Sequence, residues 1–293
     1  MSIAEAVKEA LPTLSASSIR TYSSVLGSLY KKVFGVTGEV NLKHFEEDER
    51  IIHFLRDKPA SARKSTLAAL VVLTGNDAYR KAMTADIQTY NETISKQVAT
   101  PAQKAAEISA EEIRHIYDRP STEATTLYTK KHQTVSDLLT IQDSVILALL
   151  GGVFIAPRRS LDFTAFKVRN IGATDNHLLK NELVFLTYKT ASTYGKQTVT
   201  IPKELLAIMK RWFKVNPTEW LLFDSHFKPL TSVTLNQRLN RIFGGRKISI
   251  NALRHSYLTS RFTEYSKEQK EVQKTMTDMG SSPAVLNNYV KLS

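Results

Sequence analysis

Residues 251–259 of this 293-residue chain read Asn-Ala-Leu-Arg-His-Ser-Tyr-Leu-Thr. Apolar side chains recur here at helical spacing, so we expect a helix over residues 251–265. The stretch carries Arg254 next to His255, and Tyr289 follows Arg254 by 35 residues. An arginine binds two phosphate oxygens through its planar guanidinium and stays charged, and a tyrosine hydroxyl can act as a nucleophile. The stretch therefore indicates phosphate chemistry on a helix in the last third of the chain.

Two earlier segments carry further cations. Residues 156–163 read Ala-Pro-Arg-Arg-Ser-Leu-Asp-Phe and contain two adjacent arginines. Residues 183–188 and 197–201 are rich in β-forming side chains and are joined by a polar turn, which predicts a hairpin. Lys189 follows the first of these runs, and Lys196 precedes the second. A lysine beside a flexible turn can reach a substrate and donate a proton.

In this order, an arginine segment, a hairpin lysine, a Leu-Arg-His-Ser block and a late tyrosine resemble the motifs of the tyrosine recombinases, the family of the phage-type integrases. The resemblance implies a mainly α fold with a small β-sheet (α+β), in which a helical core-binding domain and a catalytic domain form a C-shaped clamp around DNA. It implies site-specific cleavage and rejoining of DNA through a 3′-phosphotyrosyl intermediate, with no cofactor. The form of residues 157–163 is most similar to integrases of large DNA viruses, virophages and related mobile elements.

The resemblance gives each arginine a role. Arg159 rather than Arg158 fits the first catalytic arginine, because Asp162 then falls three residues later and apolar residues follow at the family's spacing. Asp162 would orient Arg159. Arg254 fits the second arginine. The two guanidinium groups would hold the pentacoordinate phosphorus of the transition state.

The resemblance also assigns the nucleophile and the proton donor. Tyr289 follows Met279-Gly280-Ser281-Ser282, which resembles the family's Leu-Gly-His-Ser-Ser, and would attack the scissile phosphate. Lys189 lies in a Tyr-Lys-Thr segment that resembles the family's Thr-Lys-Thr, and would protonate the leaving 5′-oxygen. Lys196, on the far side of the turn, is the alternative.

Two positions depart from the family pattern. Asn251 stands where the family has the histidine of His-x-x-Arg, and Ser281 follows Gly280 where the family has a histidine or tryptophan. An asparagine donates a hydrogen bond to a phosphate oxygen but does not shuttle a proton. His255 would support the site and compensate in part. We therefore expect cleavage to be slow.

Composition favours a polyanionic partner. Lys and Arg number 40 against 28 Asp and Glu, giving a net charge of +12, of which +9 falls in residues 106–293. Double-stranded DNA is the polyanion that such a charge most often serves. No cysteine is present, which excludes disulfides, thiol nucleophiles and cysteine-based zinc sites, and the seven histidines lack metal-ligand spacing. No apolar run is long enough to span a membrane, and the N-terminus does not resemble a secretion signal, so we expect an intracellular protein in the cytoplasm or nucleus, wherever its target DNA is.

The pattern of helices and breaks predicts two domains. Helical periodicity, for example over residues 61–74 and 77–92, predicts a helical DNA-binding domain over residues 1–97. Residues 98–107 read as a linker around Pro101. A capping box at residues 108–113 would open the catalytic domain, residues 108–293.

Exposed cations outside the catalytic motifs are the predicted DNA contacts. Two lie on the first long helix, one beside the first catalytic arginine, and four flank the loop before Arg254: Arg20, Lys31, Arg158, Arg238, Arg241, Arg246 and Lys247. By resemblance, the protein would be a monomer or weak oligomer when free and a homotetramer on paired DNA sites, with no membrane partner.

Two alternatives remain from the sequence. A type IB topoisomerase shares this chemistry but acts as a monomer, and would relax supercoiled DNA without pairing sites. A DNA-binding protein descended from recombinases, but without catalysis, is compatible with Asn251 and Ser281.

Overall fold

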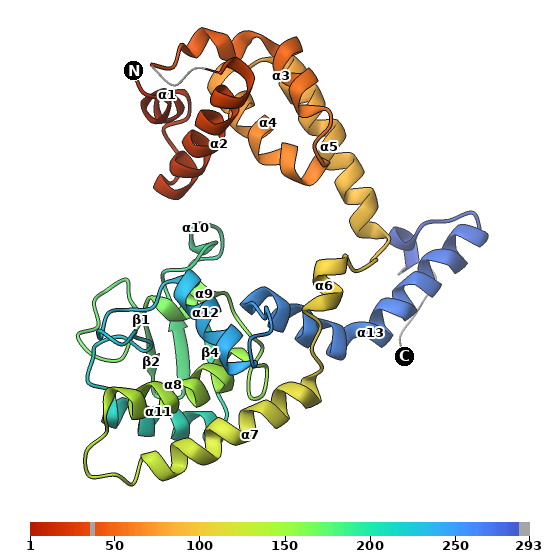
Figure 1. Ribbon diagram of the computed structural model, residues 1–293. Coiled ribbons are helices and arrows are strands. Elements are labelled where there is room, and N and C mark those ends of the chain that lie inside the picture. The colour runs from red at the N-terminus through yellow and green to blue at the C-terminus, as the bar shows by residue number, and fades with distance from the viewer. Residues whose placement is uncertain (36–38, 287–293) are drawn as a thin grey trace. The chain divides into compact units, whose positions relative to one another are not determined.

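The computed structural model describes residues 1–35 and 39–286, which form two compact units that divide after Ala99. Helices dominate both units, and the β-strands of the described residues gather in one sheet in the second unit (Figure 1). The prediction of a mainly α fold with a small β-sheet is confirmed. No helix within these two ranges is long and apolar enough to cross a lipid bilayer.

The first unit is a bundle of helices around an aromatic core. Its elements are α1 (Ile3–Ala10), α2 (Ala16–Phe34), the 3-10 helix η1 (Leu42–Glu46), α3 (Asp48–Leu55), α4 (Ala60–Thr74) and α5 (Asp77–Ser95). The predicted helices at 61–74 and 77–92 correspond to α4 and α5. Tyr30, Phe45 and Tyr79 are fully buried, and the Tyr79 hydroxyl donates to the carbonyl of Phe45 at 2.7 Å. This bond supplies the partner that a buried phenol requires.

The second unit begins with helices and returns to helices after the sheet. Its helices are α6 (Pro101–Ala105), α7 (Ala110–Leu127), α8 (Val135–Leu150), α9 (Ser160–Thr164), α10 (Ala191–Tyr194), α11 (Lys203–Val215), α12 (Ser232–Ile242), α13 (Ile250–Asp278) and the 3-10 helix η2 (Pro283–Val285). The segment predicted as a linker thus contains a short helix, α6, which begins at Pro101 with Thr100 as its N-cap.

The sheet has the order β1-β2-β3-β4, with β1 (Phe166–Lys167) parallel to β2 (Asn176–Leu179). The strands β2, β3 (Glu182–Phe185) and β4 (Gln197–Thr200) follow one another antiparallel. The hairpin expected from the sequence is therefore β3–β4, and its register places Phe185 opposite Gln197. The first strand of this hairpin, β3, ends at Phe185, so Lys189 lies four residues beyond the strand rather than at its end.

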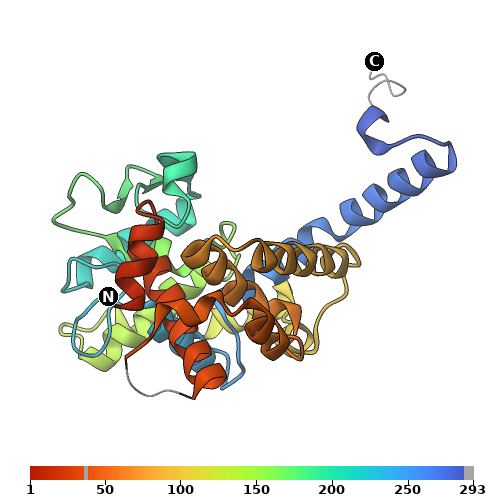
Figure 2. The same ribbon diagram turned by 90° about the horizontal axis from the view of Figure 1, so that it is seen from above.

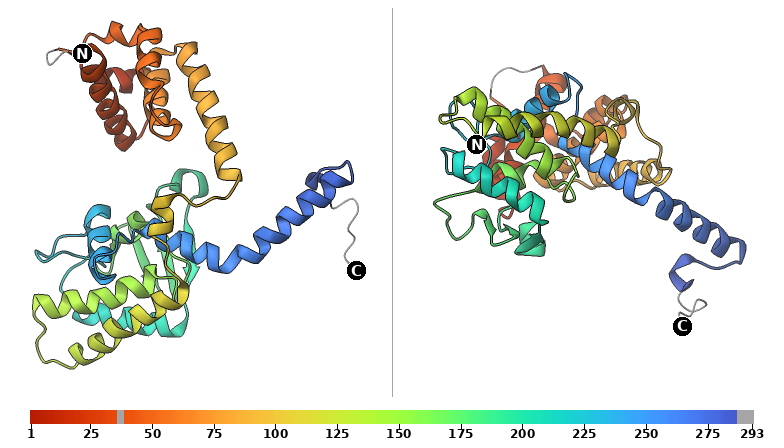
Figure 3. Two further views of the ribbon diagram at one scale, coloured as in Figure 1. Left: turned by 45° about the vertical axis from the view of Figure 1, so that its right-hand side comes forward. Right: turned by 90° about the horizontal axis from the view of Figure 1, so that it is seen from below.

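A central apolar helix, α8, contributes more buried side chains to the core of the second unit than any other described helix. Every residue from Ser144 to Leu150 is buried, because α7 and α11 pack on α8 (Figure 3). The one amide in this surface, Gln142, is fully buried and bonds both backbone groups of Phe223, at 3.0 and 2.8 Å. A helix that is apolar on all sides is expected at the centre of a domain.

The last long helix, α13, runs well past the predicted end at Tyr265. It begins at the N-cap Ser249 and continues to Asp278. Gly280 then adopts the left-handed conformation (φ +70°), and the amides of Gly280 and Ser281 bond the carbonyls of Thr277 and Met276. This is the Schellman ending, in which glycine is favoured at the left-handed position. The C-terminal half of α13 extends away from the sheet of its unit (Figure 2).

Candidate active site

Two arginines that are far apart in the sequence lie close together in the second unit. Arg159 is the N-cap residue of α9, and Arg254 is in the second turn of α13. Burial lowers the pKa of Arg254, the charge of Arg159 lowers it further, and the carboxylate of Asp162 opposes both. Charges influence one another in this way only over short distances. The structure therefore places the two arginines that the sequence predicts as catalytic within electrostatic range of each other.

Both guanidinium groups are free to bind an anion. Arg159 and Arg254 are half-buried, and within residues 1–35 and 39–286 neither side chain forms a hydrogen bond or an ion pair. An unpaired guanidinium keeps five N–H donors for a ligand. Two such groups at one place match the bidentate recognition of a phosphate.

The carboxylate of Asp162 pairs with Arg158, not with Arg159 as predicted. The Asp162 side chain is buried, and its Oδ2 accepts from Nε of Arg158 at 2.7 Å. Its other oxygen, Oδ1, is buried without a partner among the described residues. Burial raises the pKa of Asp162, and the charges of the neighbouring arginines oppose this increase. The prediction that Asp162 orients Arg159 is therefore wrong for this structure, because Arg158 occupies the bonded oxygen.

The Arg158 side chain is directed inward, which does not fit its predicted role as a DNA contact. Its Nη2 donates to Oε1 of Gln197 at 3.0 Å, and its guanidinium lies 4.0 Å from the centre of the Phe185 ring. Two of its N–H groups are thus used within the protein. The choice of Arg159 over Arg158 as the catalytic candidate agrees with this division, since only Arg159 keeps its donors free.

The two hairpin lysines are both exposed. Lys189 lies in the turn between β3 and α10, and Lys196 lies just before β4. No acceptor for either ammonium group is found in the described part of the chain. The structure therefore leaves both lysines as candidates for the proton donor.

A buried asparagine that the sequence did not single out connects the arginine segment to the lysine turn. Asn176, at the start of β2, donates to the carbonyls of Asp162 (3.0 Å) and Thr187 (2.7 Å). Its Oδ1 accepts from the amides of Leu186 and Thr187, each at 2.8 Å. All four hydrogen bonds available to the amide are made, so the segment before Lys189 is fixed to α9. Nothing local marks Asn176, because its partners come from other elements.

The first turns of α13 hold the remaining predicted residues. Asn251 lies three residues before Arg254 and shares its side of the helix, and both Asn251 and His255 are exposed. Leu253 and Ser256 are buried and face the unit. In addition, Oδ1 of Asn236 accepts from the amide of Ile250 at 3.1 Å, which ties the start of α13 to α12. Tyr289, the predicted nucleophile, lies outside the described residues.

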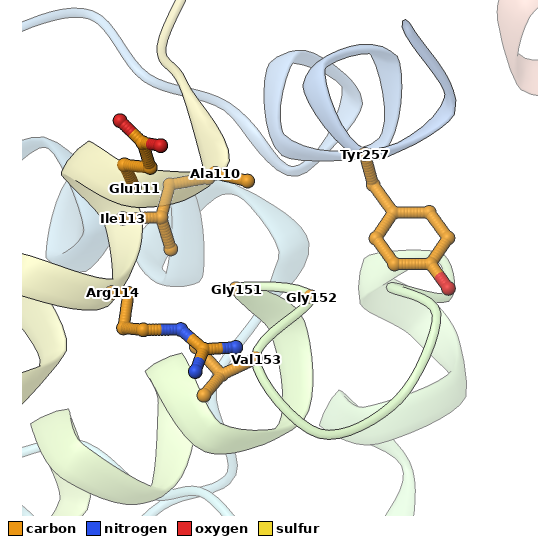
Figure 4. Close-up of a pocket in the computed structure, with 8 residues that line it drawn as sticks. All are labelled: Ala110, Glu111, Ile113, Arg114, Gly151, Gly152, Val153 and Tyr257. Atoms are coloured by element: carbon orange, nitrogen blue, oxygen red, sulfur yellow. The ribbon is translucent and has the colours of Figure 1, made fainter. Parts of the chain in front are cut away.

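A glycine turn sets how closely α13 approaches the arginine segment. Gly152 has φ +75°, and a Cβ built on it would lie 2.8 Å from Cδ2 of Tyr257, one turn after Arg254. Figure 4 shows the Tyr257 ring beside the Gly151–Gly152 turn, at a pocket of about 270 Å³ that the start of α7 also lines. A residue larger than glycine cannot occupy position 152 without moving the ring.

We expect Gly152→Ala to lower the free energy of unfolding by about 1–3 kcal/mol, because it combines a left-handed backbone with an overpacked contact. Urea unfolding followed by circular dichroism measures the change. Gly244→Ala is the matched control, since Gly244 has φ +65° but nothing within 4 Å of its added Cβ. If both variants lose the same free energy of unfolding, the contact with Tyr257 adds no cost beyond the left-handed backbone.

The predicted DNA contacts divide into free and engaged side chains. Arg20 and Lys31 on α2, and Arg241 and Lys247 around the loop before α13, are exposed. Arg238 is buried and pairs with Asp143 and the carbonyl of Leu139. The prediction that Arg238 contacts DNA is therefore wrong, because its guanidinium neutralises a carboxylate inside the unit.

Arg246 is also engaged within the second unit. It forms an ion pair with Glu112 and donates to the carbonyl of Glu107 at 2.7 Å. Ser109 accepts from the amide of Glu112 at 3.0 Å, but the Glu112 carboxylate bonds Arg246 instead of closing the predicted capping box. Arg246 therefore holds the loop before α13 to the start of α7.

Comparisons with known proteins give structural matches only. No family model matches the sequence, and no curated protein matches it. The structure is similar to XerA recombinase (10% identity, covering 89% of this chain and 83% of that chain, TM-score 0.37). It is similar to a lambda integrase dimer bound to a COC′ core site (14%, 90% and 69%, 0.46). A third match is XerH site-specific recombinase bound to its difH substrate (14%, 89% and 85%, 0.41).

Proposed function

We propose that this protein is a tyrosine recombinase, a site-specific recombinase or integrase that cuts and rejoins double-stranded DNA. The observation that carries the proposal is that Arg159 at the N-cap of α9 and Arg254 on α13 lie within electrostatic range of each other, and that neither guanidinium has a partner among the described residues. The Leu-Arg-His-Ser block and the late Tyr289 supply the order of motifs that the family shows. The matched structures come from the same class of enzyme, and the net charge of +12 suits a DNA ligand.

In this proposal each catalytic residue acts on the scissile phosphate. The hydroxyl of Tyr289 gives up its proton to solvent, and its oxygen bonds to phosphorus while the bond from phosphorus to the 5′-oxygen breaks. Arg159 and Arg254 stabilise the charge on the non-bridging oxygens, and Lys189 passes a proton to the departing 5′-oxygen. The 3′-phosphotyrosyl bond keeps the energy of the broken phosphodiester, so rejoining needs no ATP.

The replaced histidines define the expected speed. Asn251 would donate a hydrogen bond to a phosphate oxygen, and His255, the next residue after Arg254, would support it. Neither Asn251 nor His255 replaces the proton transfer that a histidine at position 251 would supply, so we propose that cleavage is slow. The functional assembly would be a homotetramer on two paired duplexes, and the first unit, with Arg20 and Lys31, would add contacts to phosphates.

Covalent trapping tests the proposal. The protein is incubated with labelled duplexes that carry a nick close to the cleavage position, drawn from DNA flanking its gene, so that cleavage releases a short fragment and cannot reverse. We expect an adduct that survives SDS and leaves a free 5′-hydroxyl. Binding without any adduct would support the non-catalytic alternative. Relaxation of supercoiled plasmid at any sequence, without pairing of sites, would support the topoisomerase alternative.

A further inference from the structure

We propose that Arg158 is a positioning residue that fastens the turn of residues 186–196, the lysine turn, to α9. It thereby fixes where Lys189 stands relative to Arg159. The first statement rests on the contacts of Arg158 alone. The consequence for catalysis rests on the proposed function.

One guanidinium contacts both ends of the lysine turn and the arginine segment. Its Nε donates to Oδ2 of Asp162 at 2.7 Å on α9, and its Nη2 donates to Oε1 of Gln197 at 3.0 Å, at the first residue of β4. Its face covers the ring of Phe185, the last residue of β3, at 4.0 Å, and the ring of Tyr188 lies at 5.5 Å. Arg158 therefore ties both ends of the lysine turn to α9, in addition to the hydrogen bonds by which Asn176 joins Asp162 to Leu186 and Thr187.

The shape of these contacts requires an arginine. A guanidinium donates in its plane while its face stacks on an aromatic ring, so it can bond Asp162 and Gln197 and cover Phe185 at once. A lysine ammonium keeps the charge but has no planar face. The Asp162 residue is 2% exposed, and its Oδ1 has no partner among the described residues, so the ion pair with Arg158 is its main compensation there.

The turn itself has its own internal bonds but little cover. The hydroxyl of Tyr188 donates to the carbonyl of Gly195 at 2.8 Å, and the amide of Gly195 donates to the carbonyl of Ala191 at 2.8 Å. Gly195 has φ +63° and ψ −152°, a conformation open essentially to glycine alone. Lys189 and residues 192–196 are exposed. The turn is therefore a preformed unit whose direction depends on how its ends are held.

For a reaction in which Lys189 donates a proton, holding the ends matters directly. A proton donor contributes only from within hydrogen-bond reach of the leaving oxygen. Arg158 directly precedes Arg159, the residue proposed to bind the phosphate, and its side chain also holds the ends of the lysine turn. Arg158 therefore couples the position of the turn to the position of Arg159. Loss of this anchor should lower the rate of proton donation without removing a phosphate contact.

The first test measures the turn without reference to activity. Trypsin cuts after exposed lysines, so cleavage after Lys189 and Lys196, followed by mass spectrometry, reports opening of the turn. We expect Arg158→Lys and Gln197→Leu to increase cleavage at these two lysines by about ten-fold or more, the effect of losing a charge-assisted hydrogen bond. Arg169→Lys is the control, because Arg169 donates to carbonyls of Phe213 and Thr218 elsewhere in the unit.

The Gln197→Leu variant keeps the test decisive if Arg158→Lys folds poorly, since it leaves the Arg158–Asp162 pair in place. Unchanged cleavage after Lys189 and Lys196 in Gln197→Leu and in folded Arg158→Lys protein would overturn the proposal. A rise equal to that in Arg169→Lys would do the same, since it would reflect general loss of stability.

The second test separates positioning from direct phosphate binding. A substrate with sulfur in place of the bridging 5′-oxygen has a leaving group that needs no proton. We expect this substrate to restore most of the cleavage lost in Arg158→Lys and in Lys189→Met. Restoration in Lys189→Met but not in Arg158→Lys would overturn the positioning role. If wild-type protein forms no adduct with either substrate, the proposed function fails, and the trypsin measurement still decides whether Arg158 holds the turn.

Discussion

Replacing Tyr289 by phenylalanine is expected to abolish the covalent adduct, with a loss of at least about 10³-fold, because the substitution removes the hydroxyl oxygen that forms the phosphotyrosyl bond in the proposed function. Phenylalanine keeps the aromatic ring, so the change is confined to the hydroxyl group. The measurement is SDS-resistant adduct formed on the nicked duplexes, with binding to the same duplexes measured in parallel. We expect binding to change little, since one hydroxyl is lost from a protein with 40 basic side chains.

Two other tyrosines provide controls of different kinds. Tyr257 lies one turn after Arg254, and no hydrogen bond of its hydroxyl is found in the described part of the chain, so it is the alternative nucleophile that the structure offers. Tyr194 is 66% exposed on the lysine turn and tests for a non-specific effect of losing a hydroxyl. Adduct that persists in Tyr289→Phe and disappears in Tyr257→Phe would transfer the role to Tyr257. Loss in Tyr194→Phe alone would place the nucleophile on the turn.

Helical periodicity predicted the helices well, because the apolar face of a helix is encoded by the spacing of residues that are close in the sequence. The segments at 61–74 and 77–92 became α4 and α5 with ends shifted by a few residues. The error at α13 has a local cause that could have been recognised. No glycine or proline occurs between Ile250 and Asp278, and residues 264–275 are rich in helix-forming side chains, so nothing in the sequence ends the helix at Tyr265.

The strands β1 and β2 were harder to predict, because their pairing is not local. The first has two residues, and the second begins with the polar pair Asn176-His177. Asn176 is buried only because Asp162, Leu186 and Thr187 surround it. A polar residue whose partners come from two distant segments reads as a loop residue in the sequence. Contacts of this kind become visible only in the tertiary structure.

The candidate site was predictable in its cations but not in their partners. Sequence spacing selected Arg159 rather than Arg158 as the catalytic candidate. The structure agrees with this choice, because Arg158 is bonded to Asp162 and Gln197 while Arg159 has no partner among the described residues. Spacing could not show that Asp162 pairs with Arg158 or that Arg238 is buried against Asp143. Which oxygen a guanidinium selects depends on side chains from distant elements, and a sequence pattern carries no information on that choice.

Arg254→Gln is expected to lower the rate of DNA cleavage by about 10²–10³-fold, the usual cost of removing one donor that stabilises transition-state charge. Glutamine keeps a polar side chain of related length but loses the charge and the bidentate geometry. The loss should appear in single-turnover cleavage of the nicked duplexes at saturating protein. Arg159→Gln should have a similar effect, and the double variant should lose less than the product of the two, because both groups act on one phosphate.

Arg254→Gln should leave the fold as stable as before, or make it more stable. Burial and the charge of Arg159 lower the pKa of Arg254, which means that its charged form is held at a cost in the free protein. A neutral residue removes that cost, and no hydrogen bond of Arg254 within the described residues is lost. Arg261→Gln, on the exposed part of α13, is the control for removing a charge from this helix. If Arg254→Gln instead lowers the midpoint of thermal unfolding and cleaves at the wild-type rate, Arg254 supports the fold and not the phosphate. Reduced cleavage with unchanged or raised stability is the combination expected of an anion site assembled from like charges, because Asp162 compensates their repulsion only in part and a bound phosphate would compensate the rest.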